Sequence, residues 1–297
     1  MNKRALLNDI FDDFVFNNIP IRLLHLGGPQ LTFVDRFFIK QHFKPTIDQI
    51  TDSEIQRGTK QSLKDLVKSK VKYAILSHRW FDVGEPTFRH VLDGQEAAPG
   101  PREAHEKLIK FCEIARRDYG CEFVWADTCC IDKTSSSELD ESIRSMFRWY
   151  RESYICIAYL RGTTEIEELA DDEWFTRGWT LQELLAPTQI KFYKRDWAPL
   201  TDDPNDKRDT PNSLMVTISK ITRIAIGDLC FFEPGFLRER LSWASNRKTT
   251  RVEDKAYSLI GILDVSLTVA YGEGSRAFLR LQQAIIETYD SWEIFAW

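Results

Sequence analysis

Hydrophobic and polar residues follow helical spacing at the start of the chain. The stretch ALLNDIFDDFVF at 5–16 places apolar side chains on one face and three aspartates on the other, which predicts an amphipathic helix. Two apolar runs follow, IPIRLLHL at 19–26 and LTFVDRFF at 31–38, and we interpret both as strands. The stretch SLKDLVKSK at 62–70 predicts a further helix.

The middle of the chain alternates between short apolar runs and longer helical patterns. This alternation is typical of βαβ units and predicts a parallel sheet. The expected strands are 71–78, 121–132, 153–160 and 189–197. The expected helices are 102–120, 135–153 and 179–186.

A polar, proline-bearing stretch, TDDPNDKRDTPNS at 201–213, predicts a loop and a boundary. The helical patterns after it lie at 211–222, 234–245, 251–263 and 275–289. We therefore divide the chain into an N-terminal helix at 1–18, an α/β core at 19–200 and a mostly helical part at 201–297.

Composition indicates a globular protein. The chain has 297 residues, of which 43% are hydrophobic, enough for a sizeable core. The formal net charge is −5 and the basic residues are scattered, which argues against a nucleic-acid binder. The sequence has no apolar run long enough for a membrane span, and acids stand where a signal peptide would be apolar. These features predict a cytoplasmic protein.

The cysteines show no spacing typical of a metal site. They form no C-x-x-C pair and have no histidine at zinc-finger spacing, so we expect no structural metal. Most of them lie in apolar runs, which favours reduced, buried thiols over disulfides. The six are Cys112, Cys121, Cys129, Cys130, Cys156 and Cys230.

Six stretches, in order, closely resemble the fungal HET (heterokaryon incompatibility) domain. They are YAILSHRW, FVWADTCCIDK, SMFRWYRES, WFTRGWTLQELLAP, TTRVEDKAYSLIGI and YGEGSRAFLRLQQAII, and the resemblance extends from about residue 19 through the closing IFAW. The N-terminal helix and the long segment before YAILSHRW depart from the family pattern. The resemblance implies a cell-death effector of fungal non-self recognition, a form of innate immunity, that responds to an upstream receptor or partner protein.

The core of this family resembles the TIR domain, whose enzymatic members cleave NAD. The resemblance therefore implies a TIR-like, flavodoxin-like sheet flanked by helices. The stretch WTLQEL is similar to the W-C-x-x-E-L helix that carries the glutamate of NAD-cleaving TIR domains, which makes Glu183 the candidate catalytic residue. NAD would be the substrate, with no further cofactor, and clustering of the domain by self-association would complete the active state.

Polar and aromatic residues toward the carboxyl ends of the predicted strands form a candidate NAD site, since ligands of parallel sheets gather there. A dinucleotide needs cations for its pyrophosphate, an aromatic surface for a base and a carboxylate for a ribose. A carboxylate can also stabilise the oxocarbenium-like sugar formed as nicotinamide leaves, without a metal. The candidates are Ser77, His78, Arg79 and Trp80 from the end of the first strand, Asp127 and Cys129 from the second, and Arg177, Trp179 and Glu183 around the short helix.

Each of these residues also has a structural interpretation. The tryptophans are more often packing residues than base stackers. Asp127 can cap a turn, and Glu183 can be a capping or solvated residue. His78 could serve a Cys-His hydrolase, but no third group is evident.

Two motifs near the end of the chain have structural interpretations as well. A buried Arg251 paired with Glu253 or Asp254 is expected as a structural ion pair, and YGEG as a turn. Three functions stay open: NAD hydrolysis, non-enzymatic signalling by self-association, and nucleotide binding without turnover.

Overall fold

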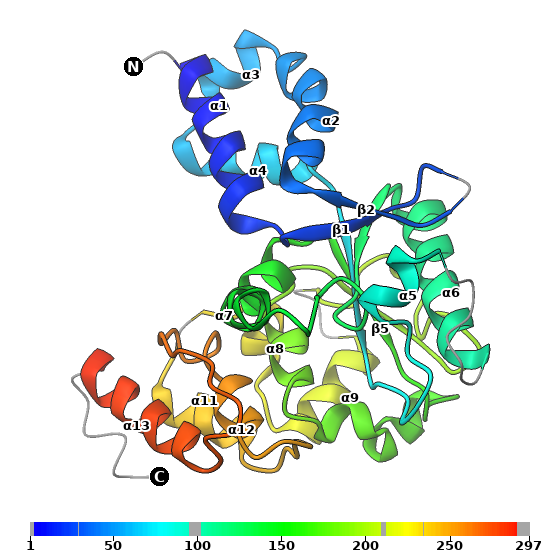
Figure 1. Ribbon diagram of the computed structural model, residues 1–297, viewed down its shortest axis with the longest axis vertical. Coiled ribbons are helices and arrows are strands. Elements are labelled where there is room, and N and C mark those ends of the chain that lie inside the picture. The colour runs from blue at the N-terminus through cyan, green and yellow to red at the C-terminus, as the bar shows by residue number, and fades with distance from the viewer. Residues whose placement is uncertain (1–2, 29, 95–101, 209–211, 234, 290–297) are drawn as a thin grey trace. The chain divides into compact units, whose positions relative to one another are not determined.

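A computed structural model of the chain describes residues 3–28, 30–94, 102–208, 212–233 and 235–289 (Figure 1). Six strands form one mixed sheet in the order β2-β1-β4-β3-β5-β6, flanked by helices, which confirms the α/β class. The strands are β1 (Arg22–His25), β2 (Thr32–Asp35), β3 (Ala74–His78), β4 (Phe123–Trp125), β5 (Ile155–Tyr159) and β6 (Ile190–Tyr193).

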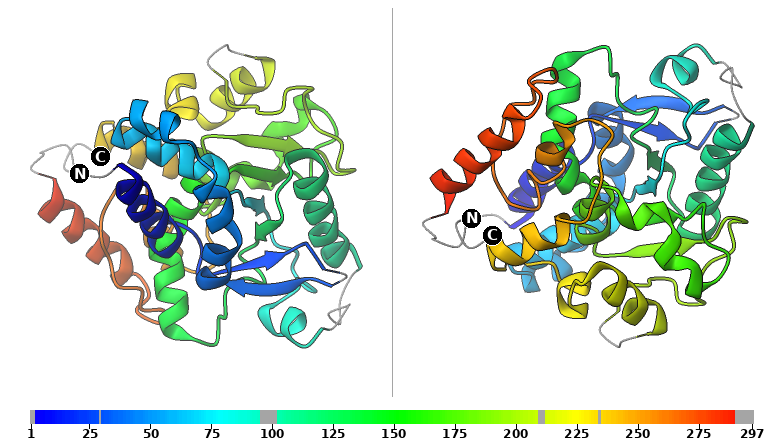
Figure 2. Two further views of the ribbon diagram at one scale, coloured as in Figure 1. Left: turned by 90° about the horizontal axis from the view of Figure 1, so that it is seen from above. Right: turned by 90° about the horizontal axis from the view of Figure 1, so that it is seen from below.

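The sheet is only partly parallel, so the prediction of a parallel sheet needs a correction. β3 pairs with β4 and β5 with β6 in parallel, whereas β1 runs antiparallel to both β2 and β4. The loop between β1 and β2 is too short for a crossover, so these two strands can only form an antiparallel hairpin. Figure 2 shows this hairpin, in blue, from two further sides.

The described residues form two compact units. The first contains residues up to Ile75, Phe81–Asp132 and Glu152–Ile155. The second contains Leu76–Trp80, Lys133–Arg151 and the chain from Cys156 onward.

The first unit begins with the predicted amphipathic helix. α1 (Lys3–Asp13) continues into one π-helical turn (Phe14–Asn18) and buries its apolar face, as expected. α1 contacts three helices. Each of them begins after an N-cap residue whose side chain accepts a backbone hydrogen bond, namely Asp35, Thr51 and Thr59. These helices are α2 (Arg36–Asp48), α3 (Asp52–Arg57) and α4 (Lys60–Lys70).

Two further helices and β4 complete the first unit. The helices are α5 (Phe88–Leu92) and α6 (Arg102–Tyr119), and α6 matches the predicted helix closely. β4 is shorter than the strand expected at 121–132, because the backbone turns at Ala126. The carbonyl of Ala126 accepts hydrogen bonds from the amides of both Cys129 and Cys130.

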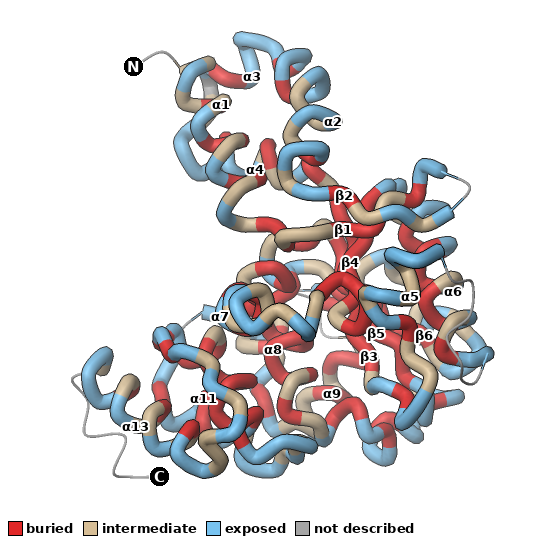
Figure 3. Tube along the Cα trace, viewed as in Figure 1, coloured by how far each residue is buried: buried red, intermediate tan, exposed pale blue. Residues whose placement is uncertain are grey.

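The second unit carries the remaining elements, and its strand residues are buried (Figure 3). Its helices are α7 (Ser136–Glu152), η2 (Ile166–Asp171), η3 (Glu173–Thr176), α8 (Thr180–Leu185), α9 (Ser213–Thr222), α10 (Ile226–Cys230), α11 (Leu237–Ala244), α12 (Asp254–Tyr257) and α13 (Arg276–Thr288). The last residue of α7, Glu152, belongs to the first unit. The helix expected at 251–263 is thus confined to α12, and the chain continues in turns. The closing IFAW lies outside the described residues.

Candidate functional site

A buried hydrogen-bond chain links β3 to α8 in the second unit. The hydroxyl of Ser77 donates to Oε2 of Glu183 at 2.5 Å, and the indole Nε1 of Trp174 donates to the same hydroxyl at 2.9 Å. Ser77 and Trp174 are fully buried, and Glu183 is 5% exposed. The expectation that Glu183 borders the core is confirmed, and a solvated glutamate is excluded.

The turn before α8 is shaped by a close backbone approach at Gly178. Its amide donates to the Lys248 carbonyl at 2.8 Å, and a Cβ at Gly178 would lie 2.5 Å from the Thr249 methyl group. Only glycine fits this approach without displacing Thr249. The glycine of the RGW stretch therefore sets where α8 begins, and with it the position of Glu183.

Arg247 secures the same turn through its side chain. Its Nη1 donates to the Arg177 carbonyl at 2.8 Å and to Oγ1 of Thr180 at 2.9 Å. Burial lowers the pKa of Arg247 to about 10, and the charge of Glu183 opposes that shift. The charge of Arg247 thus acts on Glu183.

Lys207 holds the opposite end of α8. Its ammonium donates to the carbonyls of Leu185 and Pro187 at 3.0 and 2.8 Å, and the residue is 5% exposed. A cation at this position complements the unpaired carbonyls at a helix C-terminus. Burial lowers the pKa of Lys207 to about 7, because desolvation disfavours the charged form.

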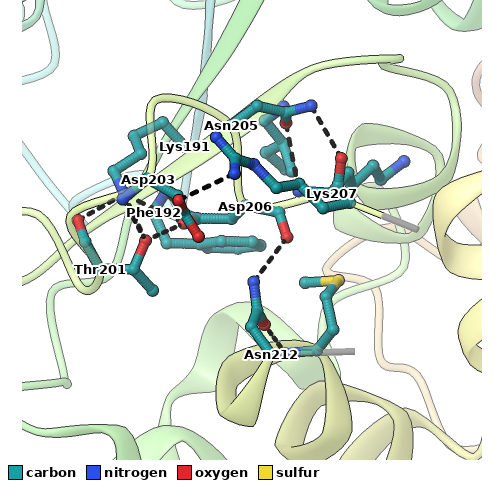
Figure 4. Close-up of polar contacts among 11 residues, drawn as sticks. Lys191, Phe192, Thr201, Asp203, Asn205, Asp206, Lys207 and Asn212 are labelled. Carbon is teal, nitrogen blue, oxygen red and sulfur yellow. Dashed lines mark hydrogen bonds and ion pairs between the residues drawn. The ribbon is translucent and has the colours of Figure 1, made fainter. Parts of the chain in front are cut away.

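A second buried lysine fixes the neighbouring strand β6 (Figure 4). Lys191 pairs with Asp206 at 3.0 Å and donates to both Thr201 oxygens, while Oδ2 of Asp206 accepts from the Phe192 amide. Burial raises the pKa of Asp206, against the attraction of Lys191. Because Asp206 and Lys207 are adjacent, one short segment anchors both β6 and the end of α8.

A cysteine lies beneath the helix. The Sγ of Cys156 lies 3.9 Å from the backbone oxygen of Glu183. Burial and the negative charge of Glu183 raise the pKa of this thiol well above its usual range. Cys156 is therefore a neutral packing residue and not a nucleophile.

The two residues that follow β3 have partners in the same unit. Nε of Arg79 pairs with Glu173 at 2.5 Å, and the Glu173 side chain is 63% exposed. The ammonium of Lys133 lies over the indole ring of Trp80, 3.7 Å from the ring centre, in a cation–π contact. Both residues reach solvent, whereas His78 is buried within β3.

Trp179 is held by a carboxylate of α12. Its side chain hydrogen-bonds Asp254, which also accepts from the Tyr271 hydroxyl at 2.8 Å. Burial raises the pKa of Asp254. Arg251 is exposed, with its guanidinium 4.6 Å from the Tyr271 ring, so the expectation of a buried Arg251 ion pair is wrong.

The YGEG stretch is a turn, as expected, and Glu253 organises it. One oxygen of Glu253 accepts from the amides of Gly272 and Gly274 at 2.9 and 3.1 Å. Both glycines have positive φ angles, 102° and 62°, which favour glycine. A hydrogen bond from its own backbone amide, followed by those from Gly272 and Gly274, lowers the pKa of Glu253.

Asp127 and Cys129 belong to the first unit, in the turn that follows β4. Asp127 is half-buried and Cys129 is fully buried. The hydrogen bond with Cys130 and burial raise the pKa of Cys129 well above its usual range. A neutral, buried thiol is unsuited to the Cys-His chemistry considered from the sequence.

Sequence reasoning missed several residues that organise this site. Trp174 lies in the same motif as Glu183, but the sequence alone indicates only an ordinary core residue. Arg247 and Lys207 lie far along the chain, in polar stretches that predict loops. For the adjacent acids of RVED, the sequence predicts only a role as ion-pair partners.

The described part of the chain contains no group of three or more histidine, cysteine or acidic residues arranged to hold a metal. Within the same residues, no helix is long and apolar enough to span a bilayer. All six cysteines are free thiols.

The second unit carries a buried carboxylate on the short helix α8. Two comparisons with known proteins identify the family of the chain. Residues 73–168 match the family described as Heterokaryon incompatibility protein (HET). A 243-residue segment, 77% of this chain, is 39% identical to the Vegetative incompatibility protein HET-E-1 of Podospora anserina and spans 17% of that protein. No solved structure matches the chain. The chain carries a HET domain, as its six motifs predicted.

Proposed function

We propose that this chain acts in fungal heterokaryon incompatibility as a cell-death effector that hydrolyses NAD to nicotinamide and an ADP-ribose product when clustered. The HET family match and the similarity to a vegetative incompatibility protein support the biological role. The observation that carries the chemistry is the buried hydrogen bond from Ser77 to Glu183, which fixes one carboxylate at the end of β3.

In this proposal Glu183 stabilises the positive charge that develops on the ribose as the nicotinamide bond breaks. A preorganised carboxylate in a poorly solvated site acts more strongly on such charge than one in water. Ser77 orients the carboxylate, and Arg247 holds the turn that precedes α8, the helix that carries Glu183. Water completes the hydrolysis at the sugar carbon.

The surrounding candidates keep the roles inferred from the sequence. Arg79 and Arg177 offer cations to the pyrophosphate, and Trp80 and Trp179 offer aromatic faces. Arg79 would exchange its exposed partner Glu173 for a phosphate oxygen, which costs little because exposed ion pairs are weak. A TIR-like core is part of the same proposal.

A second function is favoured by the low exposure of Glu183. A carboxylate that is 5% exposed and bonded to a fully buried serine can also be a structural element of the core. The domain would then signal by self-association, in response to an upstream receptor, without turnover. This alternative predicts the same fold but no dependence of NAD levels on the domain.

Incubation of the purified protein with NAD over a wide range of protein concentration separates the two functions. NAD hydrolysis predicts nicotinamide release, followed by chromatography, with a rate per molecule that rises as the protein assembles. If the assembled protein leaves NAD intact while expression still kills cells, the self-association function replaces the enzymatic one.

A further inference from the structure

A second candidate site lies in the second unit, between α7 and the turns that follow α12. Two contacts hold α7 and these turns, which form the two walls of the site, in fixed positions. Oδ1 of Asp140 on α7 accepts from the Val269 amide at 2.8 Å. At Gly261 the backbone packs so closely that an added Cβ would overlap the Phe147 side chain. The space between the walls is therefore preformed.

This space is a pocket of about 360 Å³. Its volume lies within the range of about 300–1,000 Å³ found for small-molecule sites. One wall is a face of α7 whose residues recur at helical spacing. The pocket is lined by Glu141, Arg144, Ser145, Arg148, Ile260, Val265 and Ser266.

The apolar side of the pocket results from the way the turn after α12 ends. The Val265 amide donates to the Ile260 carbonyl and the Asp264 amide to the Gly261 carbonyl, the hydrogen bonds of a Schellman motif. Asp264 adopts the left-handed conformation this motif requires, at φ 51°. The motif brings Val265 beside Ile260, and these two side chains form the apolar surface.

The polar side of the pocket is lined by two arginines, Arg144 and Arg148, one turn apart on α7. Nη2 of Arg148 donates to Oγ of Ser145 at 3.1 Å, while Nε of Arg148 is buried and has no hydrogen-bond partner among the described residues. Arg144, one turn earlier, pairs with Asp140 at 2.8 Å and is 45% exposed. The Arg148 guanidinium has donors besides the one bonded to Ser145, and a bound anion can accept from them.

The chemistry of the lining favours a phosphate over a simple carboxylate ligand. Two guanidinium groups and two hydroxyls can donate to several oxygens of one phosphate. Glu141, which accepts hydrogen bonds only, would repel a bare anion but can accept from hydroxyl groups of the same ligand. The apolar pair then packs against the carbon skeleton.

We propose that this pocket binds a small phosphate monoester that bears hydroxyl groups, of the size of a sugar phosphate. Arg148 is its principal phosphate contact, assisted by Arg144 and Ser266. Glu141 accepts from the hydroxyl groups. The site uses none of the residues assigned to NAD cleavage, so it stands independently of the proposed enzymatic function.

Titration calorimetry of the purified protein with ribose 5-phosphate tests this proposal. We expect saturable binding that Arg148→Gln weakens about ten-fold or more, as expected for loss of a charge-assisted hydrogen bond. Arg151→Gln, which changes an exposed arginine of the same helix, should leave the affinity unchanged. Inorganic phosphate should bind more weakly than ribose 5-phosphate.

A second variant, which fills the pocket, keeps the test valid even if Arg148→Gln impairs folding. Ser266 is exposed at the rim, so Ser266→Trp should abolish binding while circular dichroism and melting temperature stay close to those of the unmodified protein. Absence of saturable binding to the unmodified protein would overturn the proposal. Equal weakening by Arg148→Gln and Arg151→Gln would do the same.

Discussion

The hydroxyl of Ser77 on β3 bonds the carboxylate of Glu183 on α8 at 2.5 Å, in a region where both residues are buried. The same hydroxyl accepts the indole N–H of Trp174. Ser77 thus satisfies two buried polar groups at once. This relationship makes Glu183 a fixed group of the core, so breaking it should lower the stability of the fold.

Ser77→Ala should lower the free energy of unfolding by about 2–4 kcal/mol, because it leaves a buried carboxylate and a buried indole N–H without their shared partner. Urea denaturation measures this directly. Ser69→Ala is the matched control, since Ser69 is exposed and bonds only to its own helix. Equal effects of the two substitutions would mean that the Ser77 hydrogen bonds contribute nothing specific.

Gly178→Ala should cost about 1–3 kcal/mol, because the new Cβ meets the methyl group of Thr249. Thr249→Ser removes that methyl group and keeps the hydroxyl that donates to the Arg251 carbonyl. The double variant should therefore regain most of the lost stability, as measured by urea denaturation. Additive losses in the double variant would show that the close approach is not the cause.

Lys207 should make stability depend on pH. Its pKa falls from about 10.5 when unfolded to about 7 when folded, so between these values the unfolded chain holds more protons at this site. Its contribution to stability therefore rises with pH and is lost as pH falls toward 7. Relative to Lys207→Met, the protein should gain about 2 kcal/mol between roughly pH 6.5 and 9. A pH-independent difference between the two proteins would contradict the lowered pKa.

Arg79→Ala separates binding from stability. Its partner Glu173 is largely exposed, so the free energy of unfolding should change by less than about 1 kcal/mol. Affinity for NAD, measured by calorimetry, should fall about ten-fold if Arg79 contacts the pyrophosphate. Lys194→Ala, which breaks the ion pair with the exposed Glu165, is the control and should leave both quantities unchanged.

Helices and strands whose apolar residues recur with a clear helical or strand period could be predicted from the sequence. α6 and α7 match their predicted ranges within a few residues, and β3, β5 and β6 lie inside theirs. α2 was missed because the apolar run LTFVDRFF spans a strand and a helix start, and only the cap at Asp35 separates them. Pro45 inside that helix further weakened its pattern.

The site could be predicted only where the chemistry lies within one motif. The stripe of leucines around Glu183 indicated its position at the core, and this is confirmed. The partners of α8 could not be found, because Arg247 and Lys207 reach it from distant loops. Arg251 looked like a buried ion-pair partner, yet the structure exposes it and buries the acids instead.

The central claim is that Glu183 acts in NAD cleavage, and the most direct test compares nicotinamide release by concentrated, assembled protein and its variants. Glu183→Gln keeps an acceptor for the Ser77 hydroxyl, so we predict an unchanged fold and a rate at least about a hundred-fold lower. Glu167→Gln, on the exposed face of η2, should retain the full rate. A Glu183→Gln protein that releases nicotinamide at the rate of the unmodified protein would contradict the account.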